Sequence, residues 1–352
     1  MQGRANRSRV TRRWMSGVSL VELMIAITLG LMVMAALASI FANSSRTRED
    51  LERNSRQIEN GRFAIDLITS EMRLAGYYGS LDPRSVAAPP AVMDPCSTDP
   101  NDWIKAIRLH VQGYDNGGGI PVDCSFPNLK AATDIAVVRR VATCQAGVDP
   151  NCPGIQGATP YLQNTKCDAE LLNPFVLGMQ GTATFNLHNR GAGGVCTTVA
   201  AQRQYYVRMF YIANDNGEVP PVAIPTLKRR DFTGLGFNDT PLVEGIEQLN
   251  FEYGLDLNND SIPDVYVSDP TSYVCAGCTP ITNWMNVVTV KVYLLARNID
   301  PSPNYTDNKT YTVGKDSAGN DITVTPADHY HRHVYTGLVR IVNVAQRKEM
   351  VP

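Results

Sequence analysis

One uncharged stretch constrains this chain more than any other feature. Nineteen consecutive residues, 23–41, carry no formal charge, and the apolar run that includes them begins at residue 18. A helix needs about 20 apolar residues to span the hydrocarbon core of a bilayer, so this run is long enough. Five arginines and no acidic residue precede it: Arg4, Arg7, Arg9, Arg12 and Arg13. Positive charge favours the cytoplasmic side, which predicts a cytoplasmic N-terminus and an exported remainder.

Glu22 is the one charged residue between Trp14 and Ser45. An acidic side chain at the centre of a membrane helix costs about 3 kcal/mol, so Glu22 is a candidate functional residue that needs a partner. Three alternatives stay open. Glu22 lies near the helix end and remains hydrated, or the run is a plain transmembrane anchor, or it is a secretory signal peptide cleaved near residues 35–38. The apolar run is longer than that of an ordinary secretory signal peptide.

Together, the basic leader, Gly17 and residues 18–25 (VSLVELMI) resemble the class III signal of type IV pilins. The resemblance implies that a prepilin peptidase cuts between Gly17 and Val18 on the cytoplasmic side and then methylates the Val18 amine. Glu22 becomes the fifth residue of the mature chain. Val18 departs from the usual phenylalanine of this family, which weakens the expectation of methylation more than that of cleavage. In the proposed assembly contact, the Val18 amine of one subunit pairs with the Glu22 carboxylate of its neighbour.

The chain contains no proline between residue 18 and Pro83, which predicts one long helix ending near Gly76. Its second half is polar, with apolar residues at the spacing of an amphipathic helix: Leu51, Ile58, Ile65, Ile68 and Met72. We expect this half to lay its apolar face on a sheet. Gly61 weakens the helix there by about 1 kcal/mol relative to alanine. A coiled coil or a solvated linker helix is the alternative for residues 43–75.

Eight cysteines all follow the apolar run, on the side predicted to be exported. An even number of cysteines in an exported domain indicates disulfide bonds. Many pairings are open, and short-range pairs are preferred: Cys96 with Cys124, Cys144 with Cys152, Cys167 with Cys196, and Cys275 with Cys278. Removing the five leader arginines takes the net charge from −2 to −7. This charge argues against a nucleic-acid partner, because such a protein needs a basic patch.

Beyond the helix, the sequence predicts strands that follow one another without intervening helices. The predicted strands are 134–141, 204–212, 226–228, 249–253, 286–297 and 334–344. Residues 80–131 are predicted to be loops and turns, residues 144–200 an irregular insertion stapled by cysteines, and residues 242–248 a short helical turn. Consecutive strands favour a mainly antiparallel sheet. The predicted fold class is therefore α+β, with a long N-terminal helix packed on a β-rich head.

The second half of the chain sharpens the resemblance. Residues 243–254 (VEGIEQLNFEYG), the valine-rich strand ending at Arg297 and residues 333–343 (HVYTGLVRIVN) look like the PilW group of minor pilins, to which pseudopilin J of type II secretion is related. The resemblance implies a pilin-like protein that takes part in type IV pilus assembly, in a complex that primes assembly and sits at the tip. A minor pseudopilin of type II secretion is the alternative.

The same resemblance implies partners and a location. The partners are other minor pilins, the major pilin, prepilin peptidase and the inner-membrane assembly platform, with a tip adhesin as a further candidate. The subunit would wait in the inner membrane as a single-pass protein and then move to the pilus at the cell surface. The expected parts are a leader at 1–17, a transmembrane or fibre-core helix at 18–42, an amphipathic helix at 43–76 and an extracytoplasmic head at 77–352.

A candidate metal site lies at residues 256–264 (DLNNDSIPD). Its oxygen atoms have the spacing of short calcium loops and come from Asp256, Asn258, Asp260, the carbonyl of Ile262, and Asp264. Ser261 stands where a turn glycine is usual, and the glutamate that closes such loops is missing. Despite these two departures, the spacing of the oxygen atoms makes calcium the one candidate cofactor. A calcium site would suit a calcium-dependent adhesive tip module. A polar hairpin turn is the alternative.

Two further patterns have simpler explanations. His329, His331 and His333 would share one face of a strand, but no fourth ligand converges with them, so an exposed strand edge is preferred over a transition-metal site. Cys275 and Cys278 lack a second cysteine pair and a βαβ context, so a structural disulfide is preferred over a zinc or redox site. The sequence contains no recognised catalytic motif, and we expect no enzyme.

Overall fold

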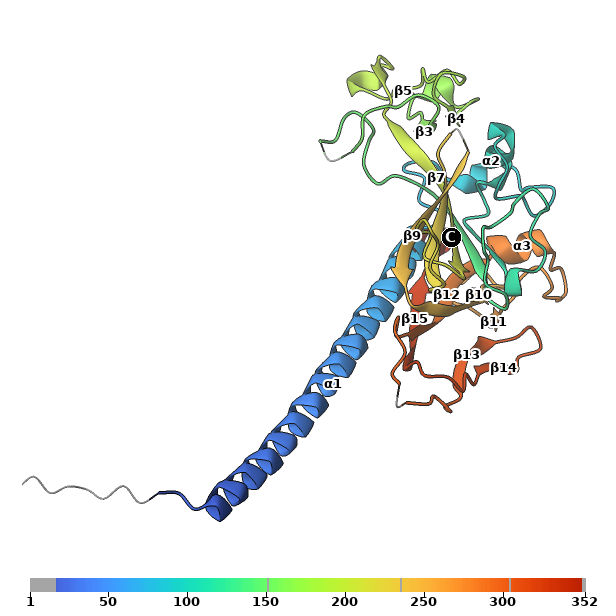
Figure 1. The fold of residues 1–352 in the computed structure, drawn as a ribbon. Helices are drawn as coiled ribbons and strands as arrows, with labels where there is room; N and C mark the ends of the chain where they lie inside the picture. Colours follow the sequence, from blue (N-terminus) through green and yellow to red (C-terminus); the bar gives the residue numbers. More distant parts are fainter. Residues whose placement is uncertain (1–16, 151, 235, 304, 350–352) are drawn as a thin grey trace, which may run out of the picture. The chain divides into compact units, whose positions relative to one another are not determined.

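The computed structural model of this protein describes most of the chain, namely residues 17–150, 152–234, 236–303 and 305–349. The five leader arginines therefore lie outside the described residues. The chain divides into two compact units, an N-terminal unit of residues 1–52 and a head of residues 53–352. Helix α1 (Leu20–Arg73) contributes its first part to the N-terminal unit and its last part to the head (Figure 1). The long helix expected from the proline-free stretch is confirmed.

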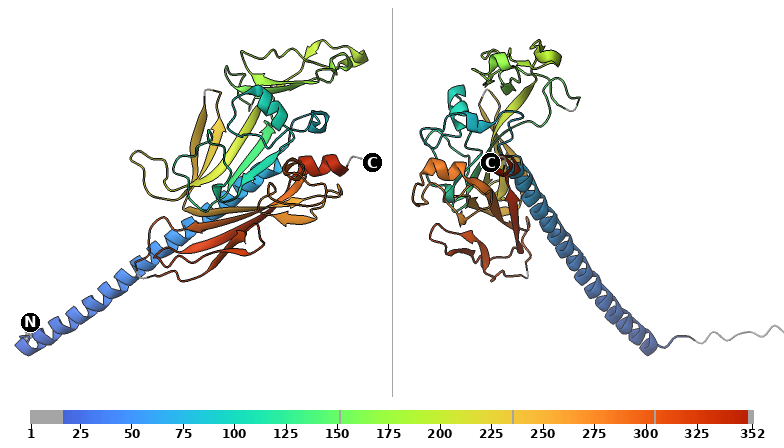
Figure 2. Two further views of the ribbon diagram at one scale, coloured as in Figure 1. Left: turned by 90° about the vertical axis from the view of Figure 1, so that its right-hand side faces the viewer. Right: turned by 180° about the vertical axis from the view of Figure 1, so that it is seen from behind.

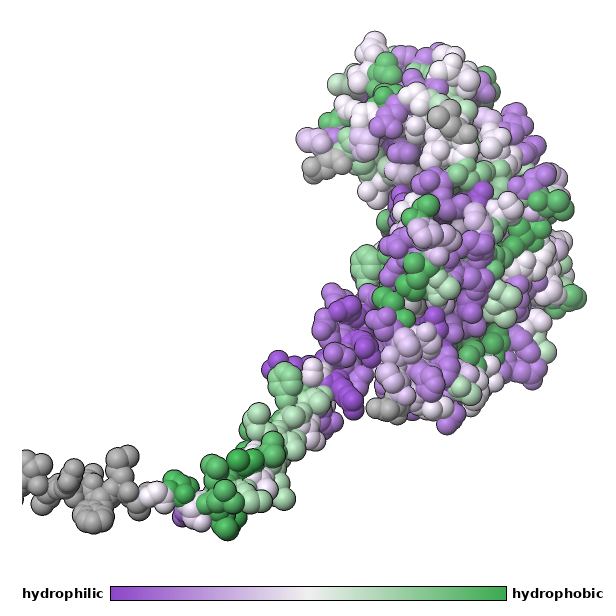
Figure 3. All heavy atoms as spheres, viewed as in Figure 1, coloured by the Kyte–Doolittle hydropathy of each residue, from purple (hydrophilic) through white to green (hydrophobic). Residues whose placement is uncertain are grey.

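In the N-terminal unit, α1 exposes its apolar side chains on all sides. Every residue from 17 to 49 is exposed, and Figure 3 shows hydrophobic surface along the beginning of the helix. This helix is long and apolar enough to cross a membrane. A helix that is apolar all round is stable when lipid or protein covers it, so this segment needs a bilayer or other helices around it.

Within the head, α1 buries a stripe of residues spaced three or four apart: Gln57, Gly61, Ala64, Ile68 and Met72. Ile68 and Met72 were expected on this face, whereas Ile58 is exposed and Leu51 lies in the N-terminal unit. The predicted face was thus partly wrong. Small residues occupy the centre of the stripe and let the sheet approach closely, and the Gln57 amide donates to the carbonyl of Ala296 at 2.8 Å.

Seven antiparallel strands form the larger sheet of the head. Its order is β1-β2-β7-β3-β4, with β8 pairing with β7 and β9 pairing with β8. The strands are β1 (Val111–Tyr114), β2 (Ile135–Val141), β3 (Pro160–Asn164), β4 (Phe175–Met179), β7 (Gln202–Ala213), β8 (Thr226–Phe232) and β9 (Phe237–Glu244). β7 is the central strand, because it pairs with β2, β3 and β8.

Four antiparallel strands form the smaller sheet, in the order β11-β10-β12-β15. They are β10 (Ile246–Leu255), β11 (Val265–Val267), β12 (Val287–Arg297) and β15 (Arg332–Arg340).

Two small hairpins complete the strands: β5 (His188–Asn189) with β6 (Thr198–Val199), and β13 (Tyr311–Lys315) with β14 (Asp321–Val324). The remaining helices are α2 (Pro100–Ala106), α3 (Pro280–Met285) and α4 (Val342–Glu349). Short 3₁₀ turns are η1 (Pro83–Ser85), η2 (Asp115–Gly117), η3 (Asp168–Glu170) and η4 (Ala192–Gly194).

An apolar core joins the two sheets and includes the end of α1. Ile68 and Met72 of α1 belong to the same buried cluster as Phe210 of β7 and Phe251 of β10. Figure 2 shows the last turns of α1 between the strands of the two sheets. A second buried cluster combines Trp103 of α2 with other residues of the larger sheet. The α+β class and the mainly antiparallel pairing are confirmed.

Two predictions near the sheets were wrong. Residues 242–248 do not form a helical turn, because β9 ends at Glu244 and Gly245 turns the chain directly into β10 with a φ of 79°. A side chain at Gly245 would also come within 2.6 Å of the Arg297 carbonyl oxygen, so the turn depends on glycine. The last strand ends at Arg340 rather than at residue 344, since helix α4 begins at Val342.

The predicted loop at 80–131 also contains regular structure. Helix α2 begins with Pro100, and the Asp99 side chain accepts the backbone N–H of Asn101. This is a standard helix start, but the polar composition around it concealed the signal. Strand β1 was missed because it is only four residues long and includes Gly113. The insertion at 144–200 likewise carries short strands.

Candidate functional site

The peptide bond between Gly17 and Val18 lies just outside α1. Residues 17–19 are non-helical and exposed, and a side chain added at Gly17 would meet no atom within 4 Å. A peptidase needs an accessible bond outside regular structure, and this bond has that environment. Cleavage between Gly17 and Val18 and methylation of the Val18 amine stay predictions.

Glu22 lies in the first turn of α1 rather than in its middle. Its Oε2 accepts the backbone N–H of Ser19 at 3.2 Å, while the Ser19 hydroxyl oxygen accepts the N–H of Val21 at 3.3 Å. A Ser-x-x-Glu pair of this kind caps a helix start, because it satisfies N–H groups that have no partner within the helix. The partial positive charge of a helix N-terminus also favours a carboxylate there. Glu22 therefore has a local role in a single subunit.

Ser19 is thus a residue that the sequence analysis missed. The signal was present, since a serine followed three residues later by a glutamate, just before an apolar run, marks a helix N-terminus. It was overlooked because the same glutamate was interpreted only as an intersubunit contact. The contact between Glu22 and a neighbouring subunit stays a prediction, and it would have to coexist with the cap or replace it.

Thr28, a polar residue six positions after Glu22, needs no outside partner. Its hydroxyl donates to the carbonyls of Met24 at 3.0 Å and Ile25 at 2.9 Å. A threonine that bonds back to its own helix can be covered by apolar surroundings at little cost. The surface that follows Glu22 therefore suits lipid or another apolar helix.

The cysteines of the head form four disulfide bonds, and they are the short-range pairs preferred from the sequence: Cys96–Cys124, Cys144–Cys152, Cys167–Cys196 and Cys275–Cys278. Cys144–Cys152 and Cys167–Cys196 lie within the insertion at 144–200, with sequence separations of 8 and 29, and Cys96–Cys124 closes a loop with a separation of 28 before it. The bond between Cys275 and Cys278 closes a short turn before α3. Disulfides in such number fit an exported domain.

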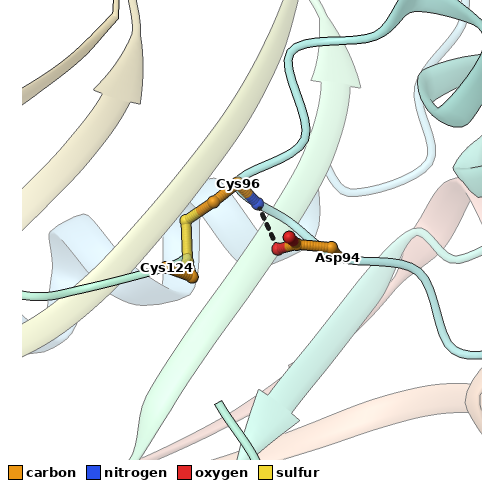
Figure 4. Close-up of side chains that lie close together, drawn as sticks. All are labelled: Asp94, Cys96 and Cys124. Atoms are coloured by element: carbon orange, nitrogen blue, oxygen red, sulfur yellow. Dashed lines mark hydrogen bonds between the residues drawn. A yellow bond between two sulfur atoms is a disulfide. The ribbon is translucent and has the colours of Figure 1, made fainter. Parts of the chain in front are cut away.

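Asp94, Cys96 and Cys124 form a close group of metal-ligand types, and it is the one such group found among the described residues. Figure 4 shows that its two cysteines form a disulfide bond, which argues against a metal site. The two sulfur atoms are bonded to each other, so neither is a thiolate that could bind a metal. The Asp94 carboxylate accepts the backbone N–H of Cys96 at 2.8 Å. The group is a structural turn.

The candidate calcium loop folds on its own hydrogen bonds. The buried Asp256 carboxylate accepts the N–H groups of Asp260 and Ser261, at 3.2 and 3.0 Å. Within the same loop, Asn258, Asp260 and Asp264 also accept backbone N–H groups, and Ile262 donates the N–H that Asp260 accepts. A cation from elsewhere in the chain, the Lys348 ammonium, lies 2.9 Å from Asp256. Calcium binding stays a prediction, and an ion at Asp256 would have to displace Lys348.

The three alternating histidines do not converge. β15 begins at Arg332, so His333 is in the strand whereas His329 and His331 precede it. His329 contacts the Tyr305 carbonyl at 2.5 Å, and the His331 ring stacks on the Tyr305 ring with centroids 3.6 Å apart. The ring of His333 instead lies edge-on to Tyr335.

The family model described as Type IV Pilus-assembly protein W matches residues 209–343, which extend from β7 through both sheets to the start of α4. Among solved structures, the chain is similar to the type IV-like pilin TTHA1219 from Thermus thermophilus, with 12% identity, a TM-score of 0.33 and coverage of 82% of this chain and 98% of that chain. The search of curated proteins found no match.

Proposed function

We propose that this protein is a minor pilin that takes part in type IV pilus assembly, within a complex that primes the fibre and sits at its tip. Prepilin peptidase cleaves between Gly17 and Val18 and methylates the new amine. The subunit waits in the inner membrane with the N-terminus in the cytoplasm, and it then enters the fibre at the cell surface. Its partners are other minor pilins, the major pilin and the inner-membrane assembly platform.

The observation that carries this proposal is the exposed apolar part of α1 in a chain that also has a PilW domain. Each apolar CH₂ group left in water costs about 0.8 kcal/mol, so this surface must be covered at every stage. Lipid can cover it before assembly, and the helices of neighbouring subunits can cover it afterwards. Thr28 bonds back to its own helix, and Glu22 accepts the Ser19 N–H, so these two polar groups have partners at either stage.

In this proposal Glu22 sets the register of the subunit in the fibre. Its carboxylate already lies at the N-terminal end of α1, against the Ser19 N–H. Cleavage after Gly17 would create a positive amine at Val18, one residue before Ser19. In the fibre, that amine pairs with the Glu22 carboxylate of a neighbour. Losing one partner of a pair buried in low dielectric costs about 3–5 kcal/mol, which penalises any other register.

The test compares Glu22→Ala with Ser19→Ala and with Gly17→Val, each in the full chain in its host cell. Glu22→Ala is expected to be processed but to abolish surface pili, because the register contact is lost. Ser19→Ala, the matched control, weakens the helix cap and should leave pilus number nearly unchanged. Gly17→Val should leave the chain unprocessed and abolish pili. Processing is measured by the mass of the mature chain, and pili are counted by electron microscopy.

The outcomes separate the competing functions. Equal pilus loss in Ser19→Ala and Glu22→Ala would reduce Glu22 to a helix cap and contradict the register role. Normal pili assembled with an unprocessed Gly17→Val chain would overturn the pilin proposal. Intact pili together with loss of protein secretion would instead indicate a minor pseudopilin of a type II secretion system.

A further inference from the structure

A cavity of about 480 Å³ lies in the head where the chain leaves α1. Its walls come from segments far apart in the sequence: the turn at Gly76, the segment around Arg108, the end of α3 and helix α4. Figure 2 shows α4 beside the C-terminal end of α1. The Arg347 guanidinium of α4 donates to the Gly76 carbonyl at 2.9 Å and so fixes one wall.

The lining combines apolar walls with positive charge. Ile107, Met285 and Val344 supply apolar surface, and the described lining includes four cationic side chains but no aspartate or glutamate. Small-molecule sites commonly have this size, a mainly apolar lining and a few placed polar groups. The charge of this cavity therefore selects among ligands that its apolar walls would otherwise accept.

Two of the four cations are neutralised within the chain. Arg84 pairs with Asp82 at 2.7 Å, and Lys348 pairs with Asp256 at 2.9 Å. Asp82 and Asp256 lie behind these cations and are not part of the lining.

The other two cations, Arg108 and Arg347, contact only carbonyl oxygens among the described residues. The Arg108 guanidinium donates to the Val86 carbonyl at 3.4 Å, and Arg347 donates to Gly76. A guanidinium offers five N–H donors in a planar fork, so both arginines keep donors for a ligand. Buried charges are normally paired; both arginines are half-buried, and neither forms an ion pair with a carboxylate among the described residues.

The surroundings of Arg347 and His110 support this view of the charge. Burial lowers the pKa of the Arg347 guanidinium and outweighs Tyr78 and Asp82, which raise it, while the nearby charge of Arg84 lowers it further. Burial also lowers the pKa of His110 to about 4, so its ring is neutral at neutral pH. The Nε2 atom of His110 lies 2.7 Å from the Val287 carbonyl oxygen. The two guanidinium groups are therefore the positive centres available to a ligand.

We propose that this cavity binds an amphipathic carboxylate, with the acid group held by Arg108 and Arg347 and an apolar body lying against Ile107, Met285 and Val344. The planar guanidinium fork matches a carboxylate with two parallel hydrogen bonds. A free organic acid and the C-terminal carboxylate of an apolar peptide share this chemistry. The site is independent of the N-terminal segment on which pilus assembly would depend.

The test uses the purified full chain in a non-ionic detergent, with binding followed by ¹⁹F NMR. The probe is 4-fluorobenzoate, and 4-fluorobenzyl alcohol is the matched uncharged probe. We expect saturable binding of the benzoate and at least about tenfold weaker binding of the alcohol, since hydrogen bonds between charged groups are stronger than those to a neutral hydroxyl. An acetylated Leu-Phe peptide with a free C-terminus, compared with its amide, then distinguishes the peptide source from the free acid.

Variants assign the binding to the cavity. Arg108→Gln and Arg347→Gln should each weaken benzoate binding about tenfold or more, while Arg190→Gln, a surface control whose pair with Asp168 is exposed, should not change it. Arg108→Gln is the decisive variant, because its only described bond is a long one to a carbonyl and its loss should leave the melting temperature unchanged. Equal binding of acid and alcohol, absence of saturable binding, or unchanged affinity in Arg108→Gln would each overturn the proposal.

Discussion

The Glu71 carboxylate, near the end of α1, lies between two arginines. Its side chain is 15% exposed and forms ion pairs with Arg140 at 3.0 Å and with Arg208 at 2.5 Å. The ring of Tyr206 lies against both guanidinium groups. Burial alone would raise the pKa of Glu71, but the hydrogen bond from Arg140 and the charge of Arg208 outweigh it and hold the pKa below its usual 4.5. This residue fixes the end of α1 to β2 and β7.

Glu71→Gln is expected to lower the free energy of unfolding of the head by about 3–5 kcal/mol, because it leaves the buried Arg140 without an anion and Arg208 with Asp231 as its remaining anion. Thermal unfolding of the full chain in detergent measures the loss. Glu59→Gln, on the exposed face of the same helix, should change stability by no more than about 0.5 kcal/mol. An equal effect of the two substitutions would contradict the role assigned to Glu71.

The same variant gives a pH test with a definite sign. A carboxylate whose folded pKa is depressed stabilises the fold above its unfolded pKa of 4.5 and loses that contribution as the pH falls through its lower folded value. The stability difference between the original chain and Glu71→Gln should therefore be largest at neutral pH and shrink under acid conditions. A difference that grows on acidification would have the wrong sign.

The contact between α1 and β15 depends on glycine. A Cβ atom at Gly61 would lie 2.1 Å from a ring carbon of Tyr335, and one at Gly337 would lie 2.9 Å from Thr69. The helix and the strand therefore approach more closely than side chains at these positions would allow. Gly61, which looked like a weak point in the sequence, permits this contact.

Gly61→Ala should therefore destabilise the head although alanine favours helices by about 1 kcal/mol. Overpacking a close contact costs about 1–3 kcal/mol, and we expect a net loss of about 1 kcal/mol in urea unfolding of the full chain. The double variant Gly61→Ala with Tyr335→Ala should lose less than the sum of the two single changes. Gly30→Ala is the control, since no atom lies within 4 Å of that position, and a loss as large as that of Gly61→Ala would refute the steric argument.

Much of the element pattern was predictable, and the failures have local causes. Strand β12 could be recognised because buried valines occupy four of its first six positions, and α1 because it lacks proline. The buried face of α1 could not be read correctly, since Gly61 and Ala64 are packed for their small size rather than for hydrophobicity. The cavity around Arg108 and Arg347 was not predictable, because it joins segments hundreds of residues apart and no local pattern encodes it.

At the scale of the whole head, one buried carboxylate links the two sheets. Asp134, just before β2, accepts the N–H groups of Phe251 at 2.8 Å and Asn116 at 2.9 Å, and its own N–H donates to the Leu249 carbonyl at 2.8 Å. Phe251 and Leu249 lie in β10 of the smaller sheet. The larger and smaller sheets therefore share hydrogen bonds as well as an apolar core, and their docking is sensitive to the charge of Asp134.

That charge makes the docking of the two sheets depend on pH. Burial raises the pKa of Asp134 from 3.8 to about 7, with Asp115 and Asp269 acting in the same direction and the two N–H donors opposing them. In the unfolded chain the carboxyl ionises above 3.8, whereas in the folded head it remains neutral until about 7. Between these values the unfolded state gains stability relative to the folded one, so the contribution of Asp134 to folding falls as the pH rises.

Asp134→Asn, which keeps the shape of the neutral acid, should remove this dependence. Its stability relative to the original chain should rise between pH 4 and pH 7 and then level off, by up to about 4 kcal/mol in all, at 1.36 kcal/mol per unit of pKa shift. Unfolding of the full chain in urea at a series of pH values measures the difference, and Asp66→Asn, on the exposed face of α1, is the control. Parallel pH profiles for the original chain and Asp134→Asn would show that folding does not raise the pKa of Asp134, and a difference that favours the original chain increasingly as the pH rises would show that the two N–H donors hold it ionised. In that second case the sheets are joined by a charged contact.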